Sequence, residues 1–147
     1  ATRSLHILGG ADLAEPFDTD ADGVVEEGSL MVIDPEHPGQ LTVSTQPYDA
    51  RVAGIVSGAG GVHPGITLQQ EGMMEGHALV ALAGRVYCLA DAGAGPIEPG
   101  DLLTTSSTPG HAMKATDGER SHGAIIGKAM TGLPGGTGLI LVLVNLQ

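Results

Sequence analysis

The chain has 147 residues, a formal net charge of −11, 41% hydrophobic residues and only 2% aromatic residues. This length and apolar content indicate one folded domain rather than a disordered chain. Six Lys and Arg stand against 17 Asp and Glu, so nucleic acid and anionic membranes are poor partners, because both bind basic surfaces. No apolar run approaches the length of a membrane span, and no membrane insertion is predicted.

The 24 glycines and nine prolines fall between short apolar runs, which is typical of an all-β protein with many tight turns. A short strand over residues 4–8 and an acidic entry loop over residues 9–29 come first. The strands then expected are Leu30–Ile33, Leu41–Ser44, Arg51–Val56, Ala78–Leu89, Leu102–Thr105, Ala112–Ala115, Gly123–Met130 and Gly138–Leu146. Residues 57–77 are predicted as a loop, in which Gln69–Glu75 is the one place for a helical turn.

Residues 25–61 and 97–136 share one pattern and predict an internal repeat. Val-Glu-Glu-Gly in the first segment matches Ile-Glu-Pro-Gly in the second, and both segments continue through a Pro-Gly turn to an apolar strand. Two such copies predict a single β domain over residues 1–147, closed into a compact barrel or sandwich with little or no helix.

The last segment, LILVLVNLQ, is almost wholly apolar. We expect a strand that is buried on both faces or paired into the core of an oligomer, because a free apolar edge would promote aggregation. Cys88 is the sole cysteine and falls within an apolar strand pattern, which favours a buried thiol over a reactive one.

Asp18, Asp20 and Asp22 alternate before Gly23, as in the first half of an EF-hand-type calcium loop. The position where that loop carries a bidentate Glu is Ser29, and no flanking helices are predicted. Two interpretations remain open: an irregular site that could hold calcium, or a solvated acidic loop. No other cofactor is expected.

Residues 10–17, GADLAEPF, resemble the Ala-Asp-Tyr-Ala-Glu signature that opens the C-terminal domains of phage tail-fibre and neck-appendage proteins. Residues 48–57, YDARVAGIVS, are similar to the strand that follows in such domains, and residues 95–103 and 109–115 are similar to segments of bacterial proteins with fibre-like stalks. The resemblance implies a β-rich, homotrimeric cap domain that follows an upstream stalk, on a virion-like appendage or an extracellular surface.

Some of these relatives belong to the self-cleaving, intramolecular-chaperone type classed as G2 peptidases. The resemblance carries only Asp12 and Glu15 over as acid and base groups for such a cleavage. Leu13 stands where the signature has Tyr, and Gly9-Gly10 stand where cleaving relatives have Ser. The alternative for both carboxylates is a structural role in accepting backbone N–H groups. Ser57 lacks the glycine spacing of a nucleophile elbow, so no catalytic triad is predicted.

The preferred hypothesis is therefore a structural or assembly cap domain that acts as a homotrimer. A self-cleaving peptidase or chaperone domain and a calcium- or ligand-binding β module are the alternatives.

Overall fold

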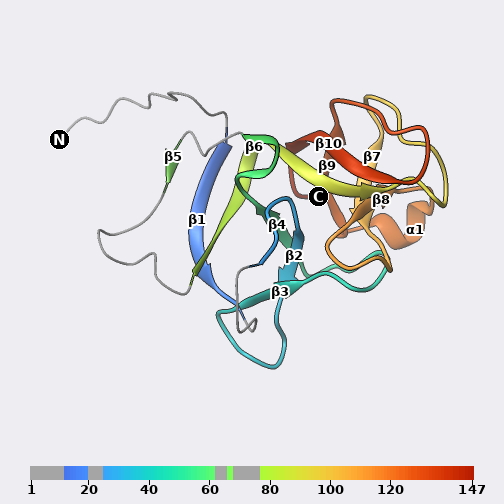
Figure 1. Ribbon diagram of the computed structural model, residues 1–147. Coiled ribbons are helices and arrows are strands. Elements are labelled where there is room, and N and C mark those ends of the chain that lie inside the picture. Colours follow the sequence, from blue (N-terminus) through green and yellow to red (C-terminus); the bar gives the residue numbers. More distant parts are fainter. Residues whose placement is uncertain (1–11, 20–24, 62–65, 68–76) are drawn as a thin grey trace.

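The computed structural model describes residues 12–19, 25–61, 66–67 and 77–147 (Figure 1). Its strands are β1 (Asp12–Asp18), β2 (Leu30–Ile33), β3 (Leu41–Val43), β4 (Val52–Val56), β5 (Ile66–Thr67), β6 (His77–Asp91), β7 (Leu102–Thr105), β8 (Ala112–Lys114), β9 (Ile125–Ala129) and β10 (Thr137–Val144). Two short helical turns accompany them, η1 (Ala59–Gly61) and α1 (Gly118–Ser121). The prediction of an all-β fold with little helix is confirmed.

One part of the molecule is a closed β-barrel. Its strands pair in the order β10, β9, β7, β8 and β6, and pairing between β6 and β10 closes the ring. The longest seam joins β10 to β6 in antiparallel register from Thr137 opposite Asp91 to Val144 opposite Gly84. The barrel strands gather on the right of Figure 1, around the end of β6 that leads to β7.

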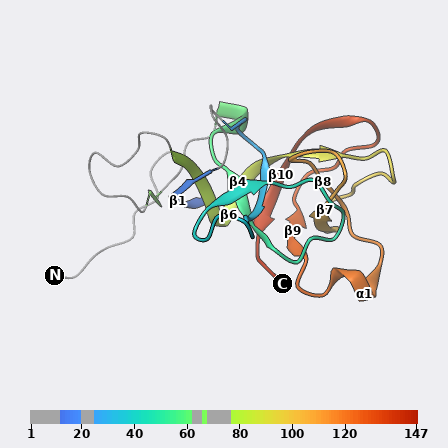
Figure 2. The ribbon, with the colours of Figure 1, turned by 90° about the horizontal axis from the view of Figure 1, so that it is seen from below.

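The remaining strands extend from the other half of β6. β4 pairs with β6, β2 pairs with β4, and β3 pairs with β2. β1 runs antiparallel to the first half of β6, with β5 on its other side. β6 thus runs through the whole molecule, from β1 to the barrel (Figures 1 and 2).

The long strand β6 can serve both parts because its side-chain alternation reverses near Gly84. Gly84 has a φ of +91°, a conformation that L side chains rarely adopt. Before this residue, Ala81 points into the main core and Val80 into a second, smaller core. After it, Val86 and Cys88 point into the main core. A single strand therefore changes which of its residues face the barrel interior.

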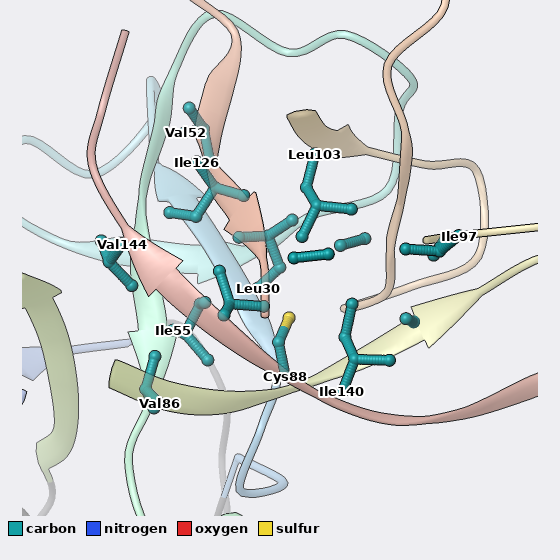
Figure 3. Packing of buried hydrophobic residues seen from close by; sticks show 14 of the residues in the cluster. Leu30, Val52, Ile55, Val86, Cys88, Ile97, Leu103, Ile126, Ile140 and Val144 are labelled. Atoms are coloured by element: carbon teal, nitrogen blue, oxygen red, sulfur yellow. The ribbon is translucent and has the colours of Figure 1, made fainter. Parts of the chain in front are cut away.

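The main core is built from aliphatic side chains of the barrel strands and of β2 and β4, as the scarcity of aromatic residues requires. Leu30, Ile55, Leu103, Ile126 and Ile140 converge there around the Cys88 thiol (Figure 3). Each of these five aliphatic residues is fully buried, and burying one such side chain contributes roughly 1.5–3 kcal/mol. The barrel interior is consequently a packed core rather than a channel.

The two segments that share a sequence pattern also pair their strands in the same way. In the first, Met31 of β2 lies opposite Val43 of β3; in the second, Leu103 of β7 lies opposite Lys114 of β8. These four positions correspond in the alignment of the two segments. The pairings of β2 with β4 and of β7 with β9 also carry an irregularity at the corresponding step.

The turns that precede β2 and β7 are also alike. Gly28 and Gly100 both have positive φ angles, +90° and +95°. The Gly28 N–H donates to Val56 O over 2.8 Å, and the Gly100 N–H donates to Ala129 O over 2.7 Å. The turn at Gly28 thereby closes onto the last residue of β4, and the turn at Gly100 closes onto the last residue of β9.

The entry-loop prediction is wrong over part of its length. Residues 9–29 were expected to form a loop, but Asp12–Asp18 form β1 because β6 supplies an antiparallel partner for them. The loop prediction over residues 57–77 likewise missed η1 and β5. The expected strand at 4–8 and the helical turn at 69–75 lie outside the described residues. In the described part of the chain, no helix is long and apolar enough to cross a membrane.

Candidate functional site

Asp12, a predicted acid or base, lies at the start of β1 and is only 3% exposed. Its Oδ2 accepts a hydrogen bond of 2.7 Å from the hydroxyl of Ser57, which is 7% exposed and follows β4. The Ser57 N–H in turn donates to Leu79 O on β6. Asp12 and Ser57 thus link β1, the end of β4 and β6. The sequence did not indicate this pair, because 45 residues separate the two side chains.

The structure does not bring Glu15 to the same place. Burial along β1 shows that Asp12 and Ala14 point inward, whereas Leu13 and Glu15 are only half buried. Successive side chains of a strand point to opposite faces, so the two carboxylates lie on different sides of β1. The Ser57 hydroxyl, rather than the Glu15 carboxylate, is the potential catalytic group that the structure places beside Asp12.

Asp18 lies exposed at the end of β1, while Asp20 and Asp22 fall outside the described residues. Among the residues that the structure describes, no group of three or more His, Cys, Asp or Glu side chains could hold a metal ion. Calcium binding at this acidic segment stays a prediction.

Exposed apolar side chains lie on the outer face of β6 and β10, which we call the β10 face. Inward residues of β10 are buried, but Leu139 and Leu143 on the outer side are each 43% exposed. Register places β6 residues beside them, with Leu89 opposite Leu139 and Tyr87 opposite Leu141. The terminal strand is thus paired with β6 along its whole length and with β9 at Val142–Val144, and it is buried on one face. Its other face is partly covered, because Gly28 approaches Leu139 and Leu89 and Gly60 of η1 approaches the Tyr87 ring. The apolar residues of the β10 face are Tyr87, Leu89, Met130, Leu139, Leu141 and Leu143.

Charge on the β10 face is divided between its two ends. Arg85 of β6 and Lys128 of β9 lie on either side of Leu143, and both are exposed. At the other end, Asp91 lies opposite Thr137. Arg85 and Asp91 share the outer side of β6 because an even number of residues separates them. One end of the face is therefore basic and the other acidic.

The Asp91 carboxylate is held ionised. A hydrogen bond of 2.6 Å from the Thr108 hydroxyl, and a second from the Gly93 N–H, lower its pKa below the ordinary value. Asp91 and Thr108 also border a shallow groove of about 310 Å³ that reaches Met113. The carboxylate keeps its charge at neutral pH while it also anchors the turn between β7 and β8.

Tyr48 links the segment between β3 and β4 to α1. Its φ of +54° is unusual for a residue other than glycine. The hydroxyl accepts hydrogen bonds of 2.9 Å from the N–H groups of Thr116 and Asp117, and the Arg120 guanidinium lies 4.6 Å from the ring centre. Burial opposes ionisation of the hydroxyl, but the hydrogen bonds outweigh it and lower the Tyr48 pKa. These contacts hold the segment before α1 in place, and they do not set the Tyr48 hydroxyl beside a side chain that could act as a base.

Cys88 lies in the main core, as its apolar sequence context predicted. Burial raises the pKa of its thiol to about 12, so the thiolate is absent near neutral pH. A nucleophilic role for this cysteine is therefore excluded in the folded chain.

Comparison with protein-family models and with curated proteins finds no match.

Proposed function

We propose that this chain is a structural assembly module of a fibre-like or surface-appendage protein, and that copies of it associate through the β10 face. The observation that carries the proposal is that Leu139 and Leu143 are each 43% exposed on a strand that β6 pairs along its whole length and β9 pairs at Val142–Val144. Neither side chain belongs to the main core, and exposed apolar surface of this kind is typical of an interface. The trimer implied by the resemblance is one of the outcomes that the test distinguishes.

Light scattering on a sizing column tests this proposal. We expect a mass that is a multiple of the 14.8 kDa chain, and Leu143→Glu should weaken self-association by about tenfold or more. Ile33→Glu is the matched control because Ile33 is 51% exposed and lies on β2, away from the β10 face. A monomer at all concentrations, or equal losses in both variants, would contradict the proposal.

A second candidate function, self-cleavage, is supported by the buried pair of Ser57 and Asp12. A carboxylate that accepts the hydroxyl proton is the arrangement that activates a serine nucleophile. Because both side chains are buried, only a peptide of the same folded chain could reach them. The test is mass spectrometry of the chain carrying an N-terminal extension. Cleavage near residues 8–12 that both Ser57→Ala and Asp12→Asn abolish would support it, and one intact product after long incubation would exclude it.

A further inference from the structure

One row of side chains crosses the outer wall of the barrel at the basic end of the β10 face. Strand register aligns one residue each from β7, β9, β10 and β6, namely Leu102, Lys128, Leu143 and Arg85. All four are exposed, and we call them the basic row. Neighbouring strands lie about 4.8 Å apart, so the two cations stand roughly 10 Å from each other with Leu143 between them.

The basic row lies away from the part of the β10 face that the chain itself covers. Gly28 approaches Leu139, whereas Leu143 lies four residues further along β10, which corresponds to roughly 13 Å. Within the described residues, Arg85 and Lys128 form no ion pair. The row is therefore an exposed surface on which two positive charges flank a leucine.

The sign of its charge determines what the basic row can meet in a neighbouring copy. Two basic rows brought face to face would set four cations around the Leu143 side chains. Like charges disfavour such a pairing, because complementary charge fixes the orientation of an interface and excludes wrong partners. The row consequently needs an acidic surface on the neighbouring copy, and the chain carries 17 Asp and Glu residues.

The described carboxylates differ in whether they already have a role within the chain. Five aspartates accept backbone N–H groups of their own turns or helix cap: Asp34, Asp49, Asp91, Asp101 and Asp117. Of the exposed glutamates, Glu36 and Glu119 stand next to a basic residue in the sequence, and Glu98 lies in the turn that holds the Lys114 ion pair. These carboxylates either hold backbone in place or have a positive charge nearby.

Glu26 and Glu27 differ from these, because they are exposed and adjacent and have no basic residue close by in the sequence. Residues 18–27 contain five Asp and Glu and no Lys, Arg or His. The backbone that carries the two glutamates is held by the Ser29 N–H, which donates to Glu26 O over 3.2 Å. We call Glu26–Ser29 the acidic turn. Within the described residues, its two carboxylates form no ion pair.

From these two surfaces we infer that the basic row of one copy binds the acidic turn of a neighbouring copy. Glu26 and Glu27 then pair with Lys128 and Arg85 across the exposed Leu143 side chain. Consecutive Cα atoms lie about 3.8 Å apart, and the long, flexible side chains of Lys and Arg span the remaining distance. This inference rests on the proposed self-association through the β10 face and specifies the surface that meets it there.

Charge reversal in two separate chains, followed by mixing, tests this pairing. The row variant carries Arg85→Glu and Lys128→Glu, and the turn variant carries Glu26→Lys and Glu27→Lys. Each variant alone should raise the dissociation constant of self-association by about tenfold or more, because like charges then face one another. An equimolar mixture of the two should return the constant to within about threefold of the original chain, measured by light scattering over a range of concentrations.

Glu119→Lys is the matched control, with the same change of charge on the exposed helix α1. It should leave self-association unchanged, and mixing it with the row variant should restore nothing. Circular dichroism establishes that each variant is folded. Glu26→Gln with Glu27→Gln removes both charges at constant side-chain size and should also weaken self-association, so the acidic turn is tested even where the Lys substitutions unfold it.

Cross-linking gives an independent readout of the same contact. A carbodiimide joins a Lys amine directly to a carboxylate that touches it. In a mixture of isotope-labelled and unlabelled chains, mass spectrometry distinguishes the links between copies from those within one copy. The expected product joins Lys128 of one copy to Glu26 or Glu27 of the other.

The outcomes distinguish this pairing from the proposed function. Restoration on mixing, together with links between Lys128 and the acidic turn, supports both. Self-association that the turn variant does not weaken, that mixing does not restore, or that links Lys128 only to other carboxylates overturns the pairing and leaves self-association through the β10 face standing. A chain that is monomeric at all concentrations overturns both.

Discussion

The close approach of β9 to β10 gives a quantitative test of the barrel. A Cβ added at Gly127 would lie 2.1 Å from Leu143 O and 3.0 Å from the Leu143 carbonyl carbon. Ordinary contact begins at 3.4 Å, so Gly127→Ala must push the backbone of β10 away by more than 1 Å, from 2.1 to 3.4 Å. That shift strains the hydrogen bond of 2.9 Å from the Asn145 N–H to Ile126 O.

Overpacking of this kind costs about 3 kcal/mol in the free energy of unfolding. For a domain of this size, it corresponds to a melting temperature lowered by about 6–12 °C. Thermal denaturation followed by far-ultraviolet circular dichroism measures it. Gly54→Ala, the corresponding change in the first copy, should behave similarly because its Cβ would lie 2.5 Å from Ala81 O. Gly95→Ala is the control, since nothing lies within 4 Å of its added Cβ. A melting temperature for Gly127→Ala within about 2 °C of the control would refute the reasoning.

Three further predictions concern single side chains. Tyr48→Phe leaves the N–H groups of Thr116 and Asp117 without the hydroxyl acceptor, and should lower the free energy of unfolding by about 1 kcal/mol in urea titrations. Cys88 should react with a thiol reagent only as fast as the chain unfolds. Its pKa is raised to about 12 in the folded state, so the native state holds the thiol proton more tightly than the unfolded state does. The free energy of unfolding should therefore fall as the pH rises from about 9 towards 12. Burial opposes ionisation of Asp49, but its hydrogen bonds with Arg51 lower its pKa below the unfolded value. The ionised carboxylate therefore stabilises the fold above about pH 4, and this stabilisation is lost on acidification. Asp49→Asn should accordingly show a shallower loss of stability in acid when the melting temperature is measured against pH.

The strand pattern was largely predictable from the sequence because short apolar runs alternate with turn residues. Leu30–Ile33 and Leu102–Thr105 have the predicted bounds. β1 was not predictable in this way, since its sequence DLAEPFD is poor in β-branched residues and contains a proline. Pro16 is accommodated because β1 pairs with β6 on one side at that point, while the described pairing with β5 is confined to Leu13 and Ala14. Tertiary pairing, rather than local propensity, makes this segment a strand.

The candidate sites depend even more on tertiary structure. The face reversal near Gly84 decides that Arg85 and Asp91 point outward, whereas an uninterrupted alternation from Ala81 would turn them inward. The pairing of Asp12 with Ser57 likewise follows from the position of β1 beside β6, which the loop prediction did not contain. Composition could identify an acidic chain with an aliphatic core, but only the register of β6 and β10 shows how the charges and leucines are arranged.

The acidic composition itself has a structural explanation in the described chain. The carboxylates of Asp34, Asp49 and Asp91 each accept the backbone N–H of the residue two positions later, which is the hydrogen bond of an Asx turn. Asp117 accepts the Arg120 N–H as the N-cap of α1, and Asp101 accepts the Glu98 N–H in the turn before β7. A chain with so many tight turns needs side-chain acceptors of this kind, so many of its carboxylates hold backbone in place. Arg85 and Lys128, by contrast, lie beside Leu143 and form no ion pair within the described residues.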